Sequence, residues 1–291
     1  MNDAPPRAAS EDMIPNVIAV ASGKGGVGKT WLSISLAQAI AQLGNRVLLF
    51  DGDLGLANID VQLGIQPSID LGTALERQMP LSRAVISYPS GGFDLVAGRS
   101  GSGSLASMPI NRLQNLAAGL REVSTGYDRV IVDLGAGIER PVRYLAGRAA
   151  YCLVVTTDEP TALTDAYALI KMVTLDAGGQ GGSLGTALGV PMGVAVNMAS
   201  SREIGQRTHE TLNKACDRFL KRQVPLLGVI RRDPKVRDSI SHQVPLLVRH
   251  PGSPAASDVE ALARRLIEIT APRTGNDPRP AAAKSTARAR S

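Results

Sequence analysis

One stretch of eight residues decides the fold of this chain, and it reads Gly23-Lys24-Gly25-Gly26-Val27-Gly28-Lys29-Thr30. The apolar run Asn16–Ser22 before it has the length of a buried strand, and the pattern Lys29–Leu43 after it is helical. Glycines between a strand and a helix let successive backbone N–H groups turn inward and form a nest for anions. The positive end of the helix dipole adds to that field. The stretch therefore predicts a phosphate-binding loop (P-loop).

The end of this loop supplies the groups that a nucleotide needs. Lys29 would place a cation against the β- and γ-phosphates, and the Thr30 hydroxyl would coordinate Mg²⁺. Trp31 follows on the helix, and we expect its ring to pack under the loop. The pattern thus predicts that the residues from Gly23 to Trp31 bind ATP or ADP together with Mg²⁺.

Three aspartates follow buried strands, at the edge of a parallel sheet where ligands bind. Asp51 and Asp53 close one apolar run, and Asp133 closes another. A P-loop ATPase needs a carboxylate beside the metal and a group that orients the attacking water. Asp133 is placed as the Walker B carboxylate, and we predict that Asp51 joins it and Thr30 as a metal ligand, although either Asp51 or Asp53 could face the γ-phosphate. Strand-ending aspartates also serve as helix caps and turn formers.

Apolar runs and helical patterns alternate along the whole chain. The further runs are Arg46–Asp51, Phe93–Ala97, Arg129–Asp133, Tyr151–Thr156, Met192–Asn197 and Leu227–Ile230, and the further helical patterns are Ile110–Val123, Thr161–Leu175, Arg202–Lys221 and Asp258–Ile269. Runs that are apolar on both faces are typical of central parallel strands. We therefore expect an α/β fold, a doubly wound and mostly parallel sheet with helices on both faces, in one domain of residues 16–270.

The two ends of the chain differ in composition from this domain. Residues 1–15 are polar and rich in Pro and Ala, and residues 271–291 carry five basic residues against one acidic residue. We expect both to be disordered tails, the second basic. No apolar h-region and no run of roughly 20 apolar residues is present, so we expect a cytoplasmic protein. Cys152 and Cys216 match no metal spacing.

Lys24 gives the loop a distinctive second lysine, and with it the stretch resembles the deviant Walker A motif of the MinD/ParA ATPases. The resemblance implies that ATP closes a sandwich homodimer in which Lys24 reaches the phosphates of the partner subunit. Such a cation in trans has the same physical purpose as an arginine finger. Lys24 is therefore a predicted catalytic residue.

The resemblance extends from Val17 to Ile269. The segment Asp51–Asp60 resembles switch I of the family, which implies that Asp53 positions the hydrolytic water, and Asp133–Gly137 resembles switch II. Asn197 matches the asparagine that reads adenine, and Gly228–Asp233 matches the loop that lines the base. This last match makes Arg231 and Asp233 predicted nucleotide-binding residues.

Two positions depart from the family pattern. Leu134 stands where switch II usually has Thr, which removes a hydroxyl from near the metal. Arg231 stands where the base loop usually has Pro, and its planar guanidinium could stack on adenine.

Three segments resemble the flagellar-number regulator branch of the family (FlhG or FleN): Leu54–Asp60, Glu159–Lys171 and Asn197–Met198 with Ser201-Arg202. This resemblance implies a regulator of the number or placement of flagella. Its partner would be a flagellar assembly protein or a signal-recognition-type GTPase. Met1–Pro15 lacks the Asp-Gln-Ala-x-x-Leu-Arg segment with which many such regulators stimulate that GTPase.

Three other interpretations remain open. A ParA-type ATPase bound to the nucleoid would position chromosome, plasmid or other cargo, and the paired basic residues permit DNA contact, although solvated helix faces are favoured. A peripheral membrane contact would use the apolar face of Asp258–Ile269, although a helix packed on the sheet is favoured. A metabolic enzyme that transfers phosphate to a small molecule is disfavoured by Lys24.

Overall fold

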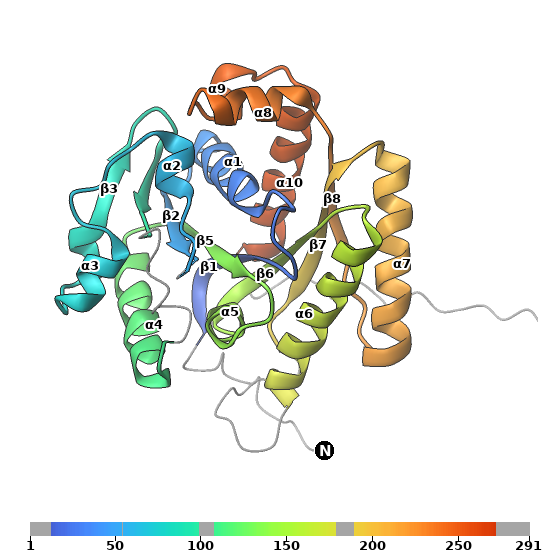
Figure 1. Ribbon diagram of the computed structural model, residues 1–291, viewed down its shortest axis with the longest axis horizontal. Helices are drawn as coiled ribbons and strands as arrows, with labels where there is room; N and C mark the ends of the chain where they lie inside the picture. The colour runs from blue at the N-terminus through green and yellow to red at the C-terminus, as the bar shows by residue number, and fades with distance from the viewer. Residues whose placement is uncertain (1–12, 54, 99–107, 179–188, 272–291) are drawn as a thin grey trace, which may run out of the picture.

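A single mixed sheet forms the middle layer of the molecule (Figure 1). The structure is a computed structural model that describes residues 13–53, 55–98, 108–178 and 189–271. Within these residues the strand order is β3-β4-β2-β5-β1-β6-β7-β8. The strands are β1 Ile14–Ser22, β2 Val47–Gly52, β3 Val85–Tyr88, β4 Phe93–Val96, β5 Arg129–Ala136, β6 Ala149–Thr156, β7 Met192–Ala199 and β8 Leu226–Arg231.

Helices connect most of these strands. They are α1 Lys29–Gln42, α2 Ile59–Leu63, α3 Leu71–Glu76, α4 Ile110–Ser124, α5 Arg140–Ala146, α6 Pro160–Gly178, α7 Arg202–Leu220, α8 Pro234–Ser241, α9 Leu246–Arg249 and α10 Pro254–Thr270, with a 3₁₀ turn, η1, at Leu81–Ala84. The predicted strands and long helices are all present, with ends that shift by a few residues. The short helices were not predicted, because a few residues give too little periodicity to detect.

Every strand pairing is parallel except that of β3 with β4. β3 is the one strand that the apolar pattern missed, and it is short and half-exposed at an edge of the sheet. β1 begins at Ile14, inside the range 1–15 that was expected to be a tail.

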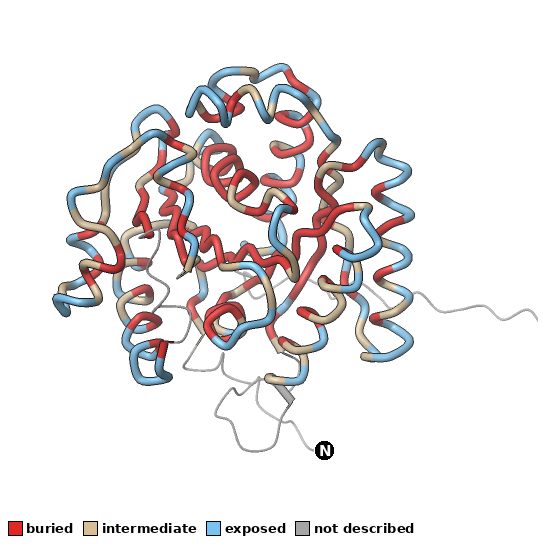
Figure 2. The backbone as a smooth tube through the Cα atoms, viewed as in Figure 1, coloured by how far each residue is buried: buried red, intermediate tan, exposed pale blue. Residues whose placement is uncertain are grey.

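Two apolar cores lie on the two faces of the sheet. Leu113, Leu145, Leu169 and Leu212, from α4, α5, α6 and α7, belong to one core. α1 and α10 contribute to the other core. Figure 2 shows the strands β1, β2, β6 and β7 and the helix α1 mostly buried. This arrangement confirms the predicted α/β class, because a doubly wound sheet carries helices on both faces.

The last helix packs on the sheet as expected. The apolar face of α10, including Val259, Leu262 and Leu266, is buried against the core that contains α1. None of the helices in the described part of the chain combines the length and apolar character that crossing a membrane requires.

Candidate functional site

The glycine-rich loop leads from β1 into α1 without a capping side chain. Gly28 is the N-cap of α1, with φ of 79°, and it has no side chain that could accept from the first N–H groups of the helix. The first turn also carries no acidic residue. The N-terminus of α1 therefore keeps its unpaired N–H groups and positive dipole end for an external anion.

Neighbouring elements hold this loop in place. The Asn197 side chain at the end of β7 is buried and donates from Nδ2 to the Val27 carbonyl over 2.8 Å. A Cβ added to Gly28 would lie 2.5 Å from the same Nδ2, and one added to Gly23 would lie 2.0 Å from the Asp165 carbonyl of α6. Only glycine fits at these two positions, because the loop packs directly on β7 and α6.

Lys29 is buried with a carboxylate and a hydroxyl. Its Nζ lies 2.9 Å from Oδ1 of Asp133 at β5, and Ser33 Oγ donates to the same oxygen over 2.8 Å. Ser33 lies one turn after Lys29, and its hydroxyl also reaches the Lys29 carbonyl. The sequence interpretation did not include Ser33, although its spacing of four residues on the α1 face was visible. The loop lysine and the predicted Walker B aspartate are thus brought together.

The other oxygen of Asp133 has no partner. Oδ2 is buried and makes no hydrogen bond within the described residues. The position fits a Mg²⁺ ion held through one or two carboxylates, the Thr30 hydroxyl and phosphate oxygens, which is the usual way this metal binds beside a nucleotide. In the described ranges no three His, Cys, Asp or Glu side chains gather as a metal cage made of protein alone would require. The residues present therefore fit a metal that arrives with its nucleotide.

Asp51 lies beside Asp133 in the sheet. The two residues are register partners of β2 and β5, and both are buried. Burial, followed by repulsion from the Asp133 carboxylate, raises the pKa of Asp51 to about 7 from its ordinary 3.8. Asp51 accepts from the N–H groups of Asp53 and Ile59, so it also shapes the start of switch I.

Asp53 belongs to switch I and lies beside switch II. Its Oδ1 accepts from the N–H groups of Gly55 and Leu56, over 3.2 and 2.9 Å. A Cβ added to Gly135 on β5 would lie 3.4 Å from the same oxygen. The carboxylate is therefore held by its own loop and faces the second switch.

Lys24 points away from this buried cluster. Its Nζ donates to Thr161 Oγ1 over 2.9 Å and pairs with Glu159 Oε2 at 3.2 Å, at the start of α6. The Lys24 side chain is 39% exposed, whereas that of Lys29 is 7% exposed. The two lysines of one loop thus lie in different environments, one at the surface and one in the buried site. The sequence interpretation did not assign Glu159 or Thr161 this role.

Comparison with known proteins assigns the loop, the two switches and the sheet to one family. The model of the CobQ/CobB/MinD/ParA nucleotide-binding domain matches residues 18–246. This chain belongs to that family. Its members are P-loop ATPases, and this MinD/ParA protein is an ATPase of the deviant Walker A kind.

The relatives include an antiactivator and a flagellum site-determining protein. The antiactivator FleN of Pseudomonas aeruginosa is 38% identical over 250 residues, which are 86% of this chain and 85% of that protein. The flagellum site-determining protein YlxH of Helicobacter pylori is 28% identical over 251 residues, 86% of this chain and 81% of that one. The septum site-determining protein MinD of Pyrococcus horikoshii, solved with Mg-ADP, shares the fold with a TM-score of 0.71 at 24% identity, covering 88% and 97% of the two chains.

The loop that matches the MinD/ParA base loop differs from the usual pattern in its residues. Arg231 binds Asp258 of α10 through its backbone N–H and its guanidinium, with Nε 2.8 Å from Oδ2, so the guanidinium is held by the protein. Arg202 pairs with the same carboxylate at 2.7 Å. Asp233 accepts from the N–H groups of Lys235 and Ala255, and so it caps α8. Contact of Arg231 or Asp233 with adenine remains a prediction, and Asp258 carried no sequence signal because it falls in an ordinary helical pattern.

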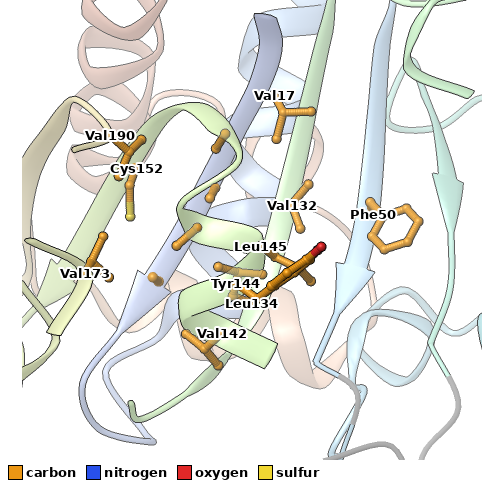
Figure 3. Packing of buried hydrophobic residues seen from close by; sticks show 14 of the residues in the cluster. Val17, Phe50, Val132, Leu134, Val142, Tyr144, Leu145, Cys152, Val173 and Val190 are labelled. Carbon is orange, nitrogen blue, oxygen red and sulfur yellow. The ribbon is translucent and has the colours of Figure 1, made fainter. Parts of the chain in front are cut away.

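Two other residues near the loop belong to the cores. The Trp31 ring is 5% exposed and packs in the core that contains α1. Leu134 is fully buried, and Figure 3 shows it beside Tyr144 and Val142 of α5. The leucine that departs from the family pattern in switch II therefore packs against α5 within this core.

Proposed function

We propose that this ATPase is a molecular switch that forms a homodimer with ATP, uses Mg²⁺, and regulates the number or placement of flagella. The observation that carries the dimer is the position of Lys24. Its ammonium lies at the surface, where a partner subunit can be reached, while Lys29 remains buried beside Asp133. One loop would thus provide Lys29 as a cation for the nucleotide of its own subunit and Lys24 as a cation for the nucleotide of the partner subunit.

The surface around the switches supports the same proposal. Leu56, just after Asp53, is 70% exposed, and Ile138, just after Gly137 of switch II, is 41% exposed. A partner that covers these two side chains would gain free energy from burying their apolar area. Closing two subunits over this face would bury them.

Each residue of the site would have a distinct task in hydrolysis. Lys29 would move from Asp133 to the β- and γ-phosphates, and Asp53 would orient the attacking water. Mg²⁺, when bound through Thr30, Asp51 and Asp133, supplies positive charge that stabilises the phosphate oxygens. Lys24 of the partner subunit would stabilise the charge that develops at the γ-phosphate, and release of phosphate would open the dimer.

The flagellar role rests on the relatives FleN and YlxH, whose names describe an antiactivator and a flagellum site-determining protein. We infer a flagellar assembly protein as the partner of the ATP-bound dimer, with a signal-recognition-type GTPase as a second candidate. The protein would act in the cytoplasm. Reversible contact with the inner membrane when ATP is bound would need a surface other than the apolar face of α10, because that face is buried in the core. DNA is a less favoured partner, and a ParA-type role on the nucleoid is the alternative function.

Light scattering of the purified protein tests the switch. We expect the mass of a monomer with ADP and of a dimer with ATP, and we expect Asp53→Ala to keep the dimer with ATP because hydrolysis is blocked. Lys24→Ala should remain a monomer under all conditions. An equal mass with ADP and ATP in the wild type and in Asp53→Ala would sink the proposal.

Co-sedimentation of the Asp53→Ala protein with ATP separates the surfaces on which it could assemble. Pelleting with anionic liposomes alone would favour the membrane. Pelleting with DNA that is lost as salt rises would move the assignment to the ParA-type role.

A further inference from the structure

A groove of about 310 Å³ lies at the free edge of β8, beside the predicted base loop and on a different strand from the P-loop. β8 is the last strand of the sheet, with α7 on one face and α10 on the other (Figure 1). Leu226–Val229 form its floor. Arg202 and Gln206 of α7 form one wall, and Ala261 and Arg265 of α10 form the other.

The backbone of β8 offers hydrogen-bonding groups to this groove. The N–H of Arg232 donates to Ala199 of β7, whereas the N–H of Arg231 points the other way and donates to Asp258. Successive residues of a strand present their peptide groups to opposite edges. Between the partners Val196–Val229 and Ala199–Arg231, β7 has one residue more than β8. The peptide groups of β8 therefore alternate regularly between its two edges from Val229 to Arg231. The N–H and C=O of Val229 therefore face the groove.

The chemistry of the walls defines what fits there. Leu227 and Leu262 are buried, at 5% and 1% exposure, and provide an apolar base. The charge of Asp258 is matched by Arg202 and Arg231. Arg265 is exposed and makes no ion pair or hydrogen bond with any described residue. The groove therefore presents an unmatched cation beside an open strand edge.

We propose that this groove receives an extended acidic segment of a partner protein, which adds to the sheet as a strand beside β8. The segment would exchange backbone hydrogen bonds with Val229, and a carboxylate of the segment would pair with Arg265. Strand addition takes its affinity from the backbone and its specificity from the side-chain sites beside it. An exposed edge without such a partner is usually blocked, and within the described residues Asp258 closes this edge at Arg231.

Peptide binding to the full-length protein with ADP tests the proposal. The probe is a fluorescein-labelled, blocked heptapeptide of alternating valine and threonine with one central glutamate, and a second peptide has lysine in place of the glutamate. We expect the glutamate peptide to bind more tightly, as measured by fluorescence anisotropy. Arg265→Glu should weaken it at least about 5-fold and favour the lysine peptide, in line with the strength of an exposed ion pair.

Two further variants make the test specific. Arg264→Glu changes a neighbouring exposed arginine of α10 that pairs with Glu260 and lies outside the groove, and it should leave peptide binding unchanged. Ala261→Trp fills the groove from an exposed position and should abolish binding while basal ATPase activity stays at the wild-type level. Hydrogen exchange should show that the Val229 amide becomes protected when the glutamate peptide binds.

Three outcomes would overturn the proposal. One is failure of the wild type to bind either peptide at millimolar concentration. Another is an equal effect of Arg264→Glu and Arg265→Glu, which would show binding by general charge. The last is self-association of the ADP-bound protein that Ala261→Trp removes, which would assign the groove to a second copy of this chain.

Discussion

At the scale of single residues, the site is arranged around a buried charge pair, and a bound nucleotide would rearrange it. Lys29 neutralises Asp133 over 2.9 Å, while Oδ2 of Asp133 stays without a partner. A buried charge is costly unless it is paired. Phosphate and Mg²⁺ together would supply the lysine and the carboxylate with new partners, so neither charge would be left alone during the exchange.

The two lysines of the loop should behave differently when removed. Lys29→Ala deletes the cation that faces the β- and γ-phosphates, so we expect nucleotide affinity to fall roughly 100-fold, the loss of a strong charge-assisted hydrogen bond. Lys24→Ala should bind ADP like the wild type but lose dimer formation and ATPase activity. Isothermal titration and a phosphate-release assay measure both effects. Equal loss of ADP affinity in the two variants would refute the division of roles.

The raised pKa of Asp51 predicts a pH dependence of stability. An unfolded Asp51 would have its ordinary pKa of 3.8, whereas the folded one has a pKa of about 7. The folded state therefore holds a proton that the unfolded state releases between these values. The stabilising contribution of this group is complete below 3.8 and is lost as pH rises through about 7.

Urea unfolding of the nucleotide-free protein across that window measures the effect. We expect Asp51→Asn to flatten the decline in the free energy of unfolding between pH 4 and pH 7, because asparagine does not titrate. The slope is the readout, since Asp51 accepts two backbone hydrogen bonds and the substitution also changes absolute stability. The same slope in both proteins would show that Asp51 does not titrate in this range.

At the scale of elements, residues at and near the start of α6 contact the P-loop. Gly23 packs against the Asp165 carbonyl, and Glu159 and Thr161 hold the Lys24 ammonium. Dimer formation through Lys24 would have to break these last contacts in both subunits. α6 would therefore oppose the proposed dimer through an ion pair that lies outside the buried site.

Weakening this ion pair should favour the dimer. Glu159→Gln removes one charge of an exposed pair worth about 0.5 kcal/mol, so we expect the ATP concentration for half-maximal dimer formation to fall about 2- to 5-fold. Glu203→Gln, an exposed acidic residue in the first turn of α7, serves as the matched control and should have no effect. An unchanged or higher ATP requirement in Glu159→Gln would mean that the Lys24 contact does not restrain the dimer.

At the scale of the whole molecule, the sheet order brings the P-loop and the two switches together at the carboxyl ends of the strands. β1 lies between β5 and β6, and β5 lies between β1 and β2, so the P-loop and both switches leave neighbouring parallel strands at their carboxyl ends. The open edge of β8 lies several strands away. The phosphates of a nucleotide and a partner segment would thus bind at separate places.

The cellular role is tested in the source organism. We expect deletion of the gene to change the number or the position of flagella, because the ATP-bound dimer would no longer act on its assembly partner. Electron microscopy of single cells measures this, with complementation by the wild type and by Lys24→Ala as the controls. Normal flagella together with mispositioned chromosomes or other cargo would favour the ParA-type role.

The amino-acid sequence by itself determined the P-loop, the strand–helix alternation and the three aspartates, because each depends on local spacing. It also determined the family, through the second lysine of the loop. Only the tertiary structure decided which side chains meet. The pairing of Lys24 with Glu159, the unpaired oxygen of Asp133 and the binding of Arg231 to Asp258 join residues far apart in the chain. Such contacts depend on strand order and helix packing, which no local pattern encodes, and the free edge of β8 follows from the same sheet order.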